Sequence, residues 1–277
     1  MTPSLLITIV TPSLNQSRFL EETIQSVIRQ DYPYIEHIVI DGGSTDGSID
    51  VIKKYDQHIS YWVSEPDTGQ SSAINKGFAK ATGQIFAWLN SDDLLMPSAI
   101  RIAAQYLMKY PDIGVVYGDR LHIDSKGNVI GINQGPSYKQ NMFKRNFTLP
   151  QETVFFRKEI FEKVGGLDEA LHFAMDFDLW CKMCKITNMR HIPFFMGCFR
   201  EHESAKSIAV HRSEENDAVK YLKEHDEVYS KHFNDSLPPP LKMQWYRLHR
   251  RLNLLFEKRS DVYRQEVLNI RSVISEQ

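Results

Sequence analysis

Short apolar runs alternate with segments of helical period along the first half of the chain. Leu20, Ile24, Val27 and Ile28, for example, recur at the spacing of one helix face. The pattern predicts strands over residues 5–10, 35–40, 59–63, 84–89 and 113–117, separated by helices that end near residues 28, 55, 81 and 109. Strands separated by helices predict an α/β fold with a mostly parallel sheet and helices on both faces.

The second half follows a different pattern. Residues 121–132 have the pattern of a hairpin with its turn at 125–128, residues 153–157 are a strand candidate, and residues 176–186 a helix. From about Arg212 the chain is charged and helical in pattern, with a break at Pro238, Pro239 and Pro240. The chain therefore ends in a predicted helical extension.

Three of the predicted strands are followed by polar residues, at 11–15, 41–46 and 90–93. In open parallel sheets, ligands bind beyond the carboxyl ends of the strands. We therefore expect these three segments to line one crevice.

The composition limits the setting and the partners. The chain of 277 residues has 33 basic and 35 acidic residues, a net charge of −2, which does not suggest a nucleic-acid partner. No apolar run approaches the ~18 residues that span a bilayer. Three cysteines form no disulfide framework, and Cys181 and Cys184 are interpreted as packing residues of a helix. A cytoplasmic location is expected.

The adjacent carboxylates Asp92 and Asp93 follow the apolar run Phe86–Leu89 directly. Like charges at a strand end repel each other unless a cation lies between them, and Mg²⁺ or Mn²⁺ prefers carboxylate oxygens and shares substrate phosphates. The sequence thus favours a metal that holds a diphosphate. The alternative is a helix cap or a solvated loop.

Other candidates are single polar residues. Asp41 ends a strand, where a carboxylate can bind a nucleotide's base or ribose, although the glycines after it also suit a capping turn. Asp176 and Asp178 cannot share one helix face, so one of them is a candidate general base. His202 lies in a polar, cationic segment suited to phosphates, but a lone histidine is more often structural.

Together these stretches resemble the family 2 glycosyltransferases of the GT-A fold over roughly residues 5 to 210. The matching stretches are ITIVTPSLNQSRFLEETIQSVIRQDYP, EHIVIDGGSTDGSIDVI, AINKGFAKATGQIFAWLNSDD, EKVGGLDEAL, DFDLW and FREHESAKS. Each is weakly specific, but they occur in the family's order.

The resemblance implies a catalytic domain over residues 1–210, with a nucleotide-binding half (1–118) and an acceptor half (119–210), followed by a helical extension (211–277). It also implies an inverting transferase with a nucleotide-sugar donor, often a UDP-sugar, and Mg²⁺ or Mn²⁺. The expected acceptor is a saccharide or lipid-linked hydroxyl of bacterial-type surface polysaccharide or glycolipid synthesis.

Site residues follow from the resemblance position by position. Asp176 would be the catalytic base, and Asp93, with Asp92, would hold the metal of a DxD-type motif, Asp93 being the preferred direct ligand. His202 would help to bind the metal or the diphosphate. The nucleotide would be bound by Thr11, Pro12, Ser13, Asp41, Asn75, Lys76 and also Asp92.

The sequence departs from the family at two positions. Asn90 stands where many members have Asp, which reduces the charge of the metal site, and Met175 stands where a Glu precedes the base. The second departure leaves open whether Asp176 or Asp178 takes the proton. It also leaves open a non-catalytic sugar-nucleotide-binding protein. A sugar nucleotidyltransferase is disfavoured because TPSLNQSRF contains no glycine for a triphosphate loop.

Residues 242–259, KMQWYRLHRRLNLLFEKR, interleave basic residues with Trp245, Tyr246, Leu252 and Phe256. A basic amphipathic helix can lie peripherally on the inner face of a membrane. The favoured alternative is packing against the catalytic domain or against a second subunit in a homodimer.

Overall fold

A computed structural model describes residues 4–139, 141–145, 147–206 and 216–236. Its strands are β1 (Ile7–Ser13), β2 (Ile35–Asp41), β3 (Tyr61–Ser64), β4 (Ile85–Trp88), β5 (Leu94–Leu95), β6 (Ile113–Ile123), β7 (Val129–Asn133), β8 (Phe155–Arg157) and β9 (Asn188–Arg200). Its helices are α1 (Ser17–Ile28), α2 (Ser48–Lys54), α3 (Gln70–Lys80), α4 (Ala99–Lys109), α5 (Lys158–Lys163), α6 (Met175–Met183) and α8 (Asn216–Phe233). Short 3₁₀ turns cover Asp56–His58, Phe143–Arg145 and Gln151–Thr153.

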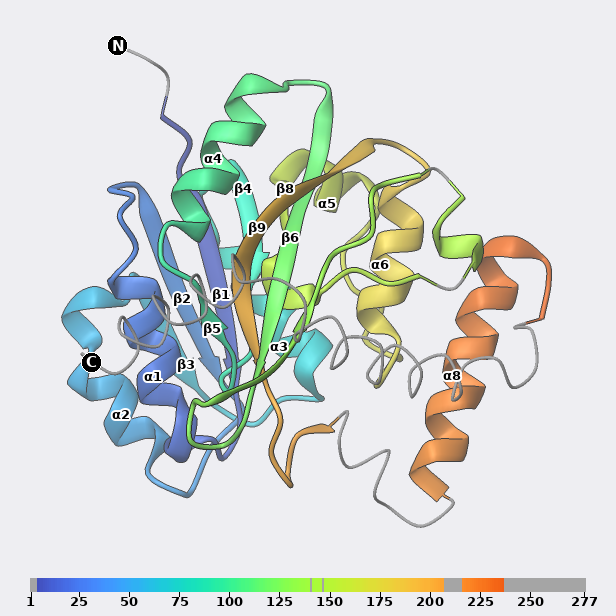
Figure 1. The fold of residues 1–277 in the computed structure, drawn as a ribbon. Coiled ribbons are helices and arrows are strands. Elements are labelled where there is room, and N and C mark those ends of the chain that lie inside the picture. The colour runs from blue at the N-terminus through green and yellow to red at the C-terminus, as the bar shows by residue number, and fades with distance from the viewer. Residues whose placement is uncertain (1–3, 140, 146, 207–215, 237–277) are drawn as a thin grey trace.

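The strands form one mixed sheet in the order β3-β2-β1-β4-β8-β6-β9-β5 (Figure 1). β7 lies outside this order and pairs with the C-terminal part of β6. The β3-β2-β1-β4 half is parallel, as its apolar runs predict. The carboxyl ends of these strands therefore share one edge, and the polar segments after β1, β2 and β4 meet there, as expected.

The second half of the sheet is mixed. β8 is antiparallel to both β4 and β6, and β6 runs parallel to β9. The predicted hairpin is present as β6 and β7, although β6 begins as early as Ile113. β9 was not predicted, because its central residues carry no regular alternation, and it delivers Arg200 and His202 to the edge that holds the metal candidates.

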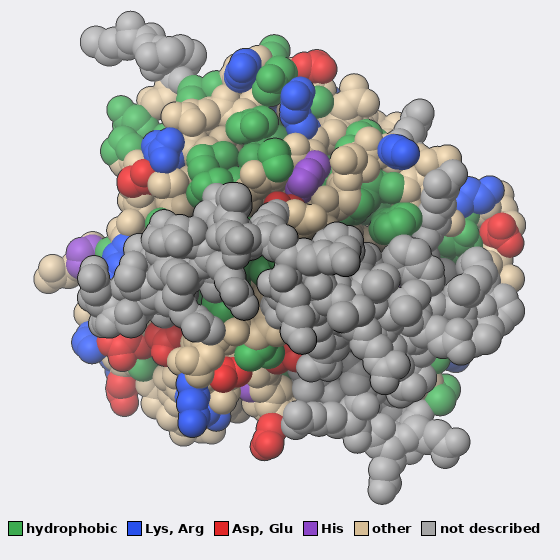
Figure 2. All heavy atoms as spheres, in the orientation of Figure 1, with side chains coloured by type: hydrophobic (Ala, Val, Ile, Leu, Met, Phe, Trp, Pro, Cys, Tyr) green, Lys and Arg blue, Asp and Glu red, His purple; other side chains and the backbone are tan. Residues whose placement is uncertain are grey.

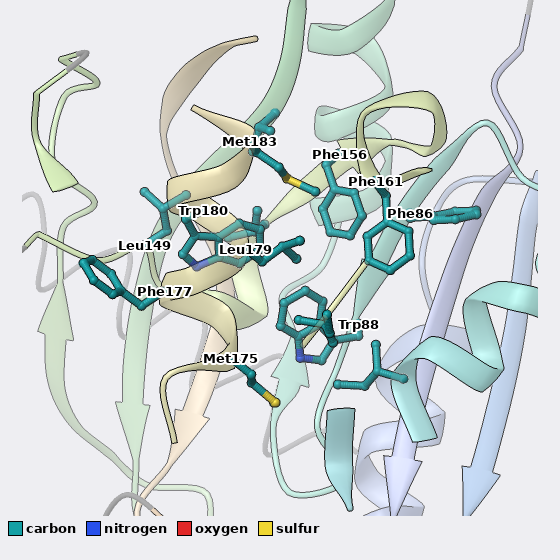
Figure 3. Close-up of a cluster of buried hydrophobic side chains, with 14 of the residues drawn as sticks. Phe86, Trp88, Leu149, Phe156, Phe161, Met175, Phe177, Leu179, Trp180 and Met183 are labelled. Atoms are coloured by element: carbon teal, nitrogen blue, oxygen red, sulfur yellow. The ribbon is translucent and has the colours of Figure 1, made fainter. Parts of the chain in front are cut away.

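Helices cover both faces of the sheet. Apolar residues of α1, α2 and α4 pack against one face, and those of α3 and α6 against the other. Trp88 of β4 stacks on Trp180 of α6 with ring centroids 5.4 Å apart. Trp180 and Met175 point from α6 toward Trp88, whereas Phe177 points away from it (Figure 3). This packing fixes α6 against the strand that precedes Asp92.

The first helix of the predicted extension is part of this packed unit. α8 lies beside α6 at the outer edge of the molecule (Figure 1), and its Val228 and Tyr229 are buried in the main core cluster. Across the boundary placed at residue 210, α8 therefore packs on the main hydrophobic core of the preceding residues. The predicted membrane or subunit contact of residues 242–259 lies outside the described residues.

In the described segments, acidic and basic side chains are interspersed on the face shown in Figure 2. No helix there has both the length and the apolar character required to cross a bilayer.

Candidate active site

Asp92 and His202 meet at the carboxyl edge of the sheet. Oδ2 of Asp92 lies 3.0 Å from Nε2 of His202, and the Asp92 side chain keeps 19% of its surface exposed. The other ring nitrogen of His202 lies 3.0 Å from the hydroxyl of Ser204, and the ring packs on Phe19. An oriented imidazole beside a free carboxylate oxygen is a pair of donors suited to a divalent cation.

Asp93 is turned toward the interior and is 1% exposed. Its Oδ1 accepts the backbone N–H of Arg200 at 2.9 Å, and its Oδ2 accepts from Nδ2 of Asn90 at 3.3 Å. Burial, together with the charges of Asp92 and Glu152, raises the pKa of Asp93 well above its usual range. That Asp93 is the direct metal ligand stays a prediction; of the two carboxylates, the one with exposed surface is Asp92.

Arg200 holds the turn that carries both carboxylates. Its Nε donates to the carbonyl of Asp92 at 2.8 Å, while its Nη2 donates to Glu22 at 2.6 Å. The guanidinium, fully buried, also lies over the ring of Phe19, 4.8 Å from the centroid. Arg200 therefore fixes the orientation of the Asp92 backbone from a strand that is distant in sequence.

Asn90 joins a chain of neutral amides. Its Oδ1 accepts from Nε2 of Gln70 at 2.8 Å, and its Nδ2 donates to Oε1 of Gln151 at 3.1 Å. Gln151 in turn donates to the carbonyl of Trp88, and Lys206 donates to Gln70 at 3.4 Å. An aspartate at position 90 would place an acceptor against the acceptor oxygens of Gln151 and Asp93, where Asn90 now donates. The hydrogen-bond network therefore explains why this chain has Asn at position 90.

Asp176 lies in the first turn of α6 and is partly buried. Its Oδ1 accepts the N–H of Phe177 at 2.7 Å. Desolvation raises the pKa of Asp176 to about 6, although the hydrogen bond and the charges of Arg120 and Lys206 oppose the rise. A carboxyl group with a pKa near neutrality is suited to accept a proton.

Asp178 has a structural role. Its carboxylate is fully buried and contacts Nζ of Lys182 at 2.7 Å, Nζ of Lys231 at 3.2 Å and Nε2 of His232 at 2.8 Å. Burial alone would raise the pKa of Asp178, but these partners lower it well below the usual range. The two aspartates left open by the sequence therefore differ: the pKa of Asp176 is raised, whereas that of Asp178 is lowered by its cationic partners.

Met175, the second departure, is also explained by packing. The Ser71 hydroxyl lies 2.8 Å from its sulfur, and Met175 belongs to the main core cluster. A glutamate side chain here would be buried against that cluster. The substitution thus serves the contact between α3 and α6, and Asp176 remains beside it.

Asp41 is fully buried at the end of β2. Its carboxylate accepts from the N–H groups of Gly43 and Ser44 and from the hydroxyls of Ser44 and Ser64. Asp41 therefore has the capping role that the sequence allowed, because it holds the loop after β2. Its role in nucleotide binding stays a prediction, and its surface is fully buried in this structure.

Thr11, Pro12 and Ser13 are buried within β1, which continues past the predicted end at Val10 because these residues pair with Val39–Asp41 of β2. Thr11 Oγ1 lies 3.0 Å from Nε2 of the buried His37. The three residues therefore underlie the expected nucleobase pocket as part of the sheet, and the exposed loop begins at Leu14.

Asn75 and Lys76 are also engaged. The Asn75 amide donates to the carbonyl of Leu167 and accepts its N–H, at 3.0 and 3.1 Å, and Lys76 forms an ion pair with Glu65. Asn75 thus joins the AINKG and GGLDE stretches, two of the motifs that carried the resemblance.

Arg120 was not identified from the sequence, whereas Lys206 belongs to the cationic segment around His202 that was; both cations act on the Asp176 carboxyl, and Glu152 adjoins Arg120. The charge of Arg120 lowers the pKa of both Asp93 and Asp176, and its Nη1 contacts Glu152 at 3.3 Å. Only the position of Arg120 on β6, next to β9, reveals this role. Lys206 lines a cavity of about 170 Å³ with Gln70 and His172.

Comparison with known proteins decides the family. The model of the family described as glycosyl transferase family 2 matches residues 8–165. The chain belongs to this family. The family domain thus contains Asp41, Asn75, Asp92 and Asp93, whereas Asp176 and His202 lie beyond the matched residues.

Curated relatives of this family 2 glycosyltransferase are bacterial. An uncharacterised glycosyltransferase of Rickettsia typhi is 28% identical over 238 residues, which are 83% of this chain and 72% of the relative. One from Mycobacterium tuberculosis is 30% identical over 185 residues, 64% of this chain and 68% of the relative. The chain spans 37% of a longer Rickettsia conorii relative.

Solved structures confirm the GT-A fold. Residues 1–349 of Staphylococcus aureus TarS, in complex with UDP-GlcNAc, align with a TM-score of 0.63 at 19% identity over 86% of this chain and 77% of that one. The Pyrobaculum calidifontis mannosyltransferase PcManGT, in complex with GDP-Man and Mn²⁺, aligns with a TM-score of 0.62 at 18% identity over 100% and 82%.

Proposed function

We propose that this glycosyltransferase moves a sugar from a nucleotide-sugar donor to an acceptor hydroxyl with inversion at the anomeric carbon, and that Asp176 is the base. The observation that supports this most strongly is the contact of the partly exposed Asp92 carboxylate with the buried His202, together with a carboxyl whose pKa is about 6. Arg120 acts electrostatically on the carboxyls of both parts of the site.

The residues present fit a divalent cation that is shared with the donor. Within the described residues no group of three or more His, Cys, Asp or Glu side chains converges on one point. Mg²⁺ and Mn²⁺ retain several positions for water and substrate phosphates, so two protein ligands suffice. We propose Asp92 and His202 as those ligands, with Asp93 positioning the turn. When bound, the cation would neutralise charge on the diphosphate leaving group.

Asp176 would accept the proton of the acceptor hydroxyl as its oxygen attacks the anomeric carbon from the side opposite the diphosphate. Inversion requires a single displacement, so no nucleophilic side chain is needed. Arg120 and Lys206 would offset the negative charge of the diphosphate, since both cations lie near the carboxyls of the site. A positioned base accounts for about 10²–10⁴-fold of the rate.

The donor is proposed to be a UDP-sugar and the acceptor a saccharide or a lipid-linked hydroxyl of bacterial surface polysaccharide or glycolipid synthesis. The TarS complex with UDP-GlcNAc supports the first proposal. Because PcManGT is in complex with GDP-Man, GDP-sugars are also tested as donors. The second rests on the bacterial origin of the curated relatives.

A panel of UDP-, GDP- and dTDP-sugars with Mn²⁺ tests the proposal. A true donor raises the melting temperature, because a ligand that binds only the folded chain stabilises it. The same donor should then release free nucleoside diphosphate with the wild-type chain but not with Asp176→Asn. A donor that binds without any release would instead support the sugar-nucleotide-binding alternative.

A further inference from the structure

Glu224 of α8 caps the helix that carries the proposed base. Its carboxylate accepts the backbone N–H groups of His172 at 3.0 Å, of Ala174 at 2.6 Å and of Phe173. The amides of His172 and Phe173 precede α6, which begins at Met175, and the third belongs to Ala174, the N-cap residue of the helix. The N-terminal amides of a helix have no partner inside the helix and need an acceptor from elsewhere.

α6 does not provide that acceptor itself. Its N-cap residue is Ala174, which makes no side-chain cap hydrogen bond. An Asp, Asn, Ser or Thr at this position is the usual solution. Here the acceptor comes from a helix 50 residues further along the chain.

α8 holds the other end of the same turn as well. Lys231 and His232 contact Asp178 at 3.2 and 2.8 Å, two residues after Asp176. Val228 and Tyr229, between these two anchor points, are buried against the core. Asp176 therefore lies between a cap on its N-terminal side and an ionic contact on its C-terminal side, and both come from α8.

We propose that Glu224 is a positioning residue for transfer, holding the start of α6 so that the Asp176 carboxylate faces the acceptor. This inference rests on the proposed function of Asp176. It extends the catalytic unit past residues 8–165, which the family model covers, into α8.

The physical reason is geometric. Without the Glu224 carboxylate, three consecutive amides lose their acceptor, and the 172–175 segment has no other side-chain cap. Lys206 lies over the ring of Phe173, 5.6 Å from its centroid, so this cation is held through the same segment. Displacing a reacting group by about 1 Å can cost about 10²-fold in rate.

The test compares Glu224→Ala, Glu224→Gln and the control Glu227→Ala, all in the full chain. Glu227 lies one turn further along α8 and pairs only with exposed Lys223 in the described contacts. Turnover is measured per active site, counted by titration with UDP and Mn²⁺. Glu224→Ala should lower kcat about 10- to 100-fold with an unchanged Kd for UDP. Glu224→Gln, which keeps one acceptor oxygen, should be intermediate, and Glu227→Ala should equal the wild type.

A purely structural role would lower the melting temperature and the active-site count but leave kcat per site at the wild-type value, and that result would overturn the proposal. Amide hydrogen exchange over residues 172–178 gives a readout that needs no donor. Faster exchange in both Glu224 variants, but not in Glu227→Ala, supports the cap. This holds even if no tested donor is turned over, because the lack of turnover would count against the proposed function alone. Unchanged exchange contradicts the cap.

Discussion

The Asp92 carboxylate and the His202 imidazole lie 3.0 Å apart although they are 110 positions apart in the chain. Their meeting depends on the parallel pairing of β6 with β9, which carries the chain back to the carboxyl edge of the sheet. Arg200, at the end of β9, donates a hydrogen bond to the backbone carbonyl of Asp92. The geometry of the proposed metal site therefore depends on a strand that sequence periodicity did not predict.

Asp92→Asn should weaken Mn²⁺-dependent binding of the donor's nucleoside diphosphate. Loss of one charged contact costs about 1.5–3 kcal/mol, which corresponds to roughly a 10- to 150-fold rise in Kd. Asp93→Asn is the comparison: its amide oxygen can still accept the Arg200 N–H, but its NH2 group would face the Asn90 amide. Calorimetric titration with and without Mn²⁺ measures both. If Asp93→Asn lost more Mn²⁺-dependent affinity than Asp92→Asn, Asp93 rather than Asp92 would be the direct metal ligand.

The rate of transfer should rise with pH through about 6 and then level off. Asp176 must be deprotonated to accept the acceptor's proton, and its pKa is raised to about 6. A pH profile of kcat/KM for the free enzyme reports this ionisation. Full activity persisting well below pH 5 would exclude Asp176 as the base.

Asp176→Asn should abolish transfer yet stabilise the fold above pH 6. A carboxyl whose folded pKa is raised costs stability as pH rises from its unfolded value of 3.8 through about 6. The whole difference corresponds to about 3 kcal/mol at most. The melting temperature of the variant should thus exceed that of the wild type at pH 8 and match it at pH 3.5. An equal gap at both pH values would contradict this origin.

Asp178→Asn should destabilise the fold at neutral pH, the opposite of the effect expected for Asp176→Asn. The lowered pKa of Asp178 means that its contacts with Lys182, Lys231 and His232 stabilise the fold above the unfolded value of 3.8, and this stability is lost as pH falls. Breaking a buried ion pair costs 3–5 kcal/mol, and because Lys231 is half exposed we expect about 2–3 kcal/mol. Denaturant unfolding at pH 7 and near pH 2 measures it, because the contribution is complete above the unfolded value and is lost only as pH falls toward the lowered pKa of the folded chain. Turnover per folded molecule should fall less than in Glu224→Ala, because the Glu224 contacts on the N-terminal side of Asp176 remain.

Asn90→Asp should destabilise the chain when no metal is present. The new carboxylate would face Asp93 and the Gln151 carbonyl oxygen, both of which now accept from the Asn90 amide. An unsatisfied buried group costs about 1–3 kcal/mol. Melting curves should show a deficit that shrinks on adding Mn²⁺ and UDP. Gln151→Glu provides the comparison, because it keeps an acceptor for the Asn90 amide but loses the donor to the Trp88 carbonyl.

Periodicity in the sequence was sufficient for the parallel half of the sheet, because each strand there is a short apolar run and each helix has its own apolar face. It also placed three polar strand ends at one edge. The motif order predicted family 2 and the GT-A fold, which the family match and the solved structures confirm.

The choice between adjacent carboxylates needed the tertiary structure. Asp92 differs from Asp93, and Asp176 from Asp178, in what surrounds each side chain rather than in its own chemistry. Those surroundings come from Arg200 and from α8, far along the chain, and burial and ion pairing depend on contacts that no local pattern encodes. The same long-range contacts explain why a helix outside the family domain caps the one that bears Asp176.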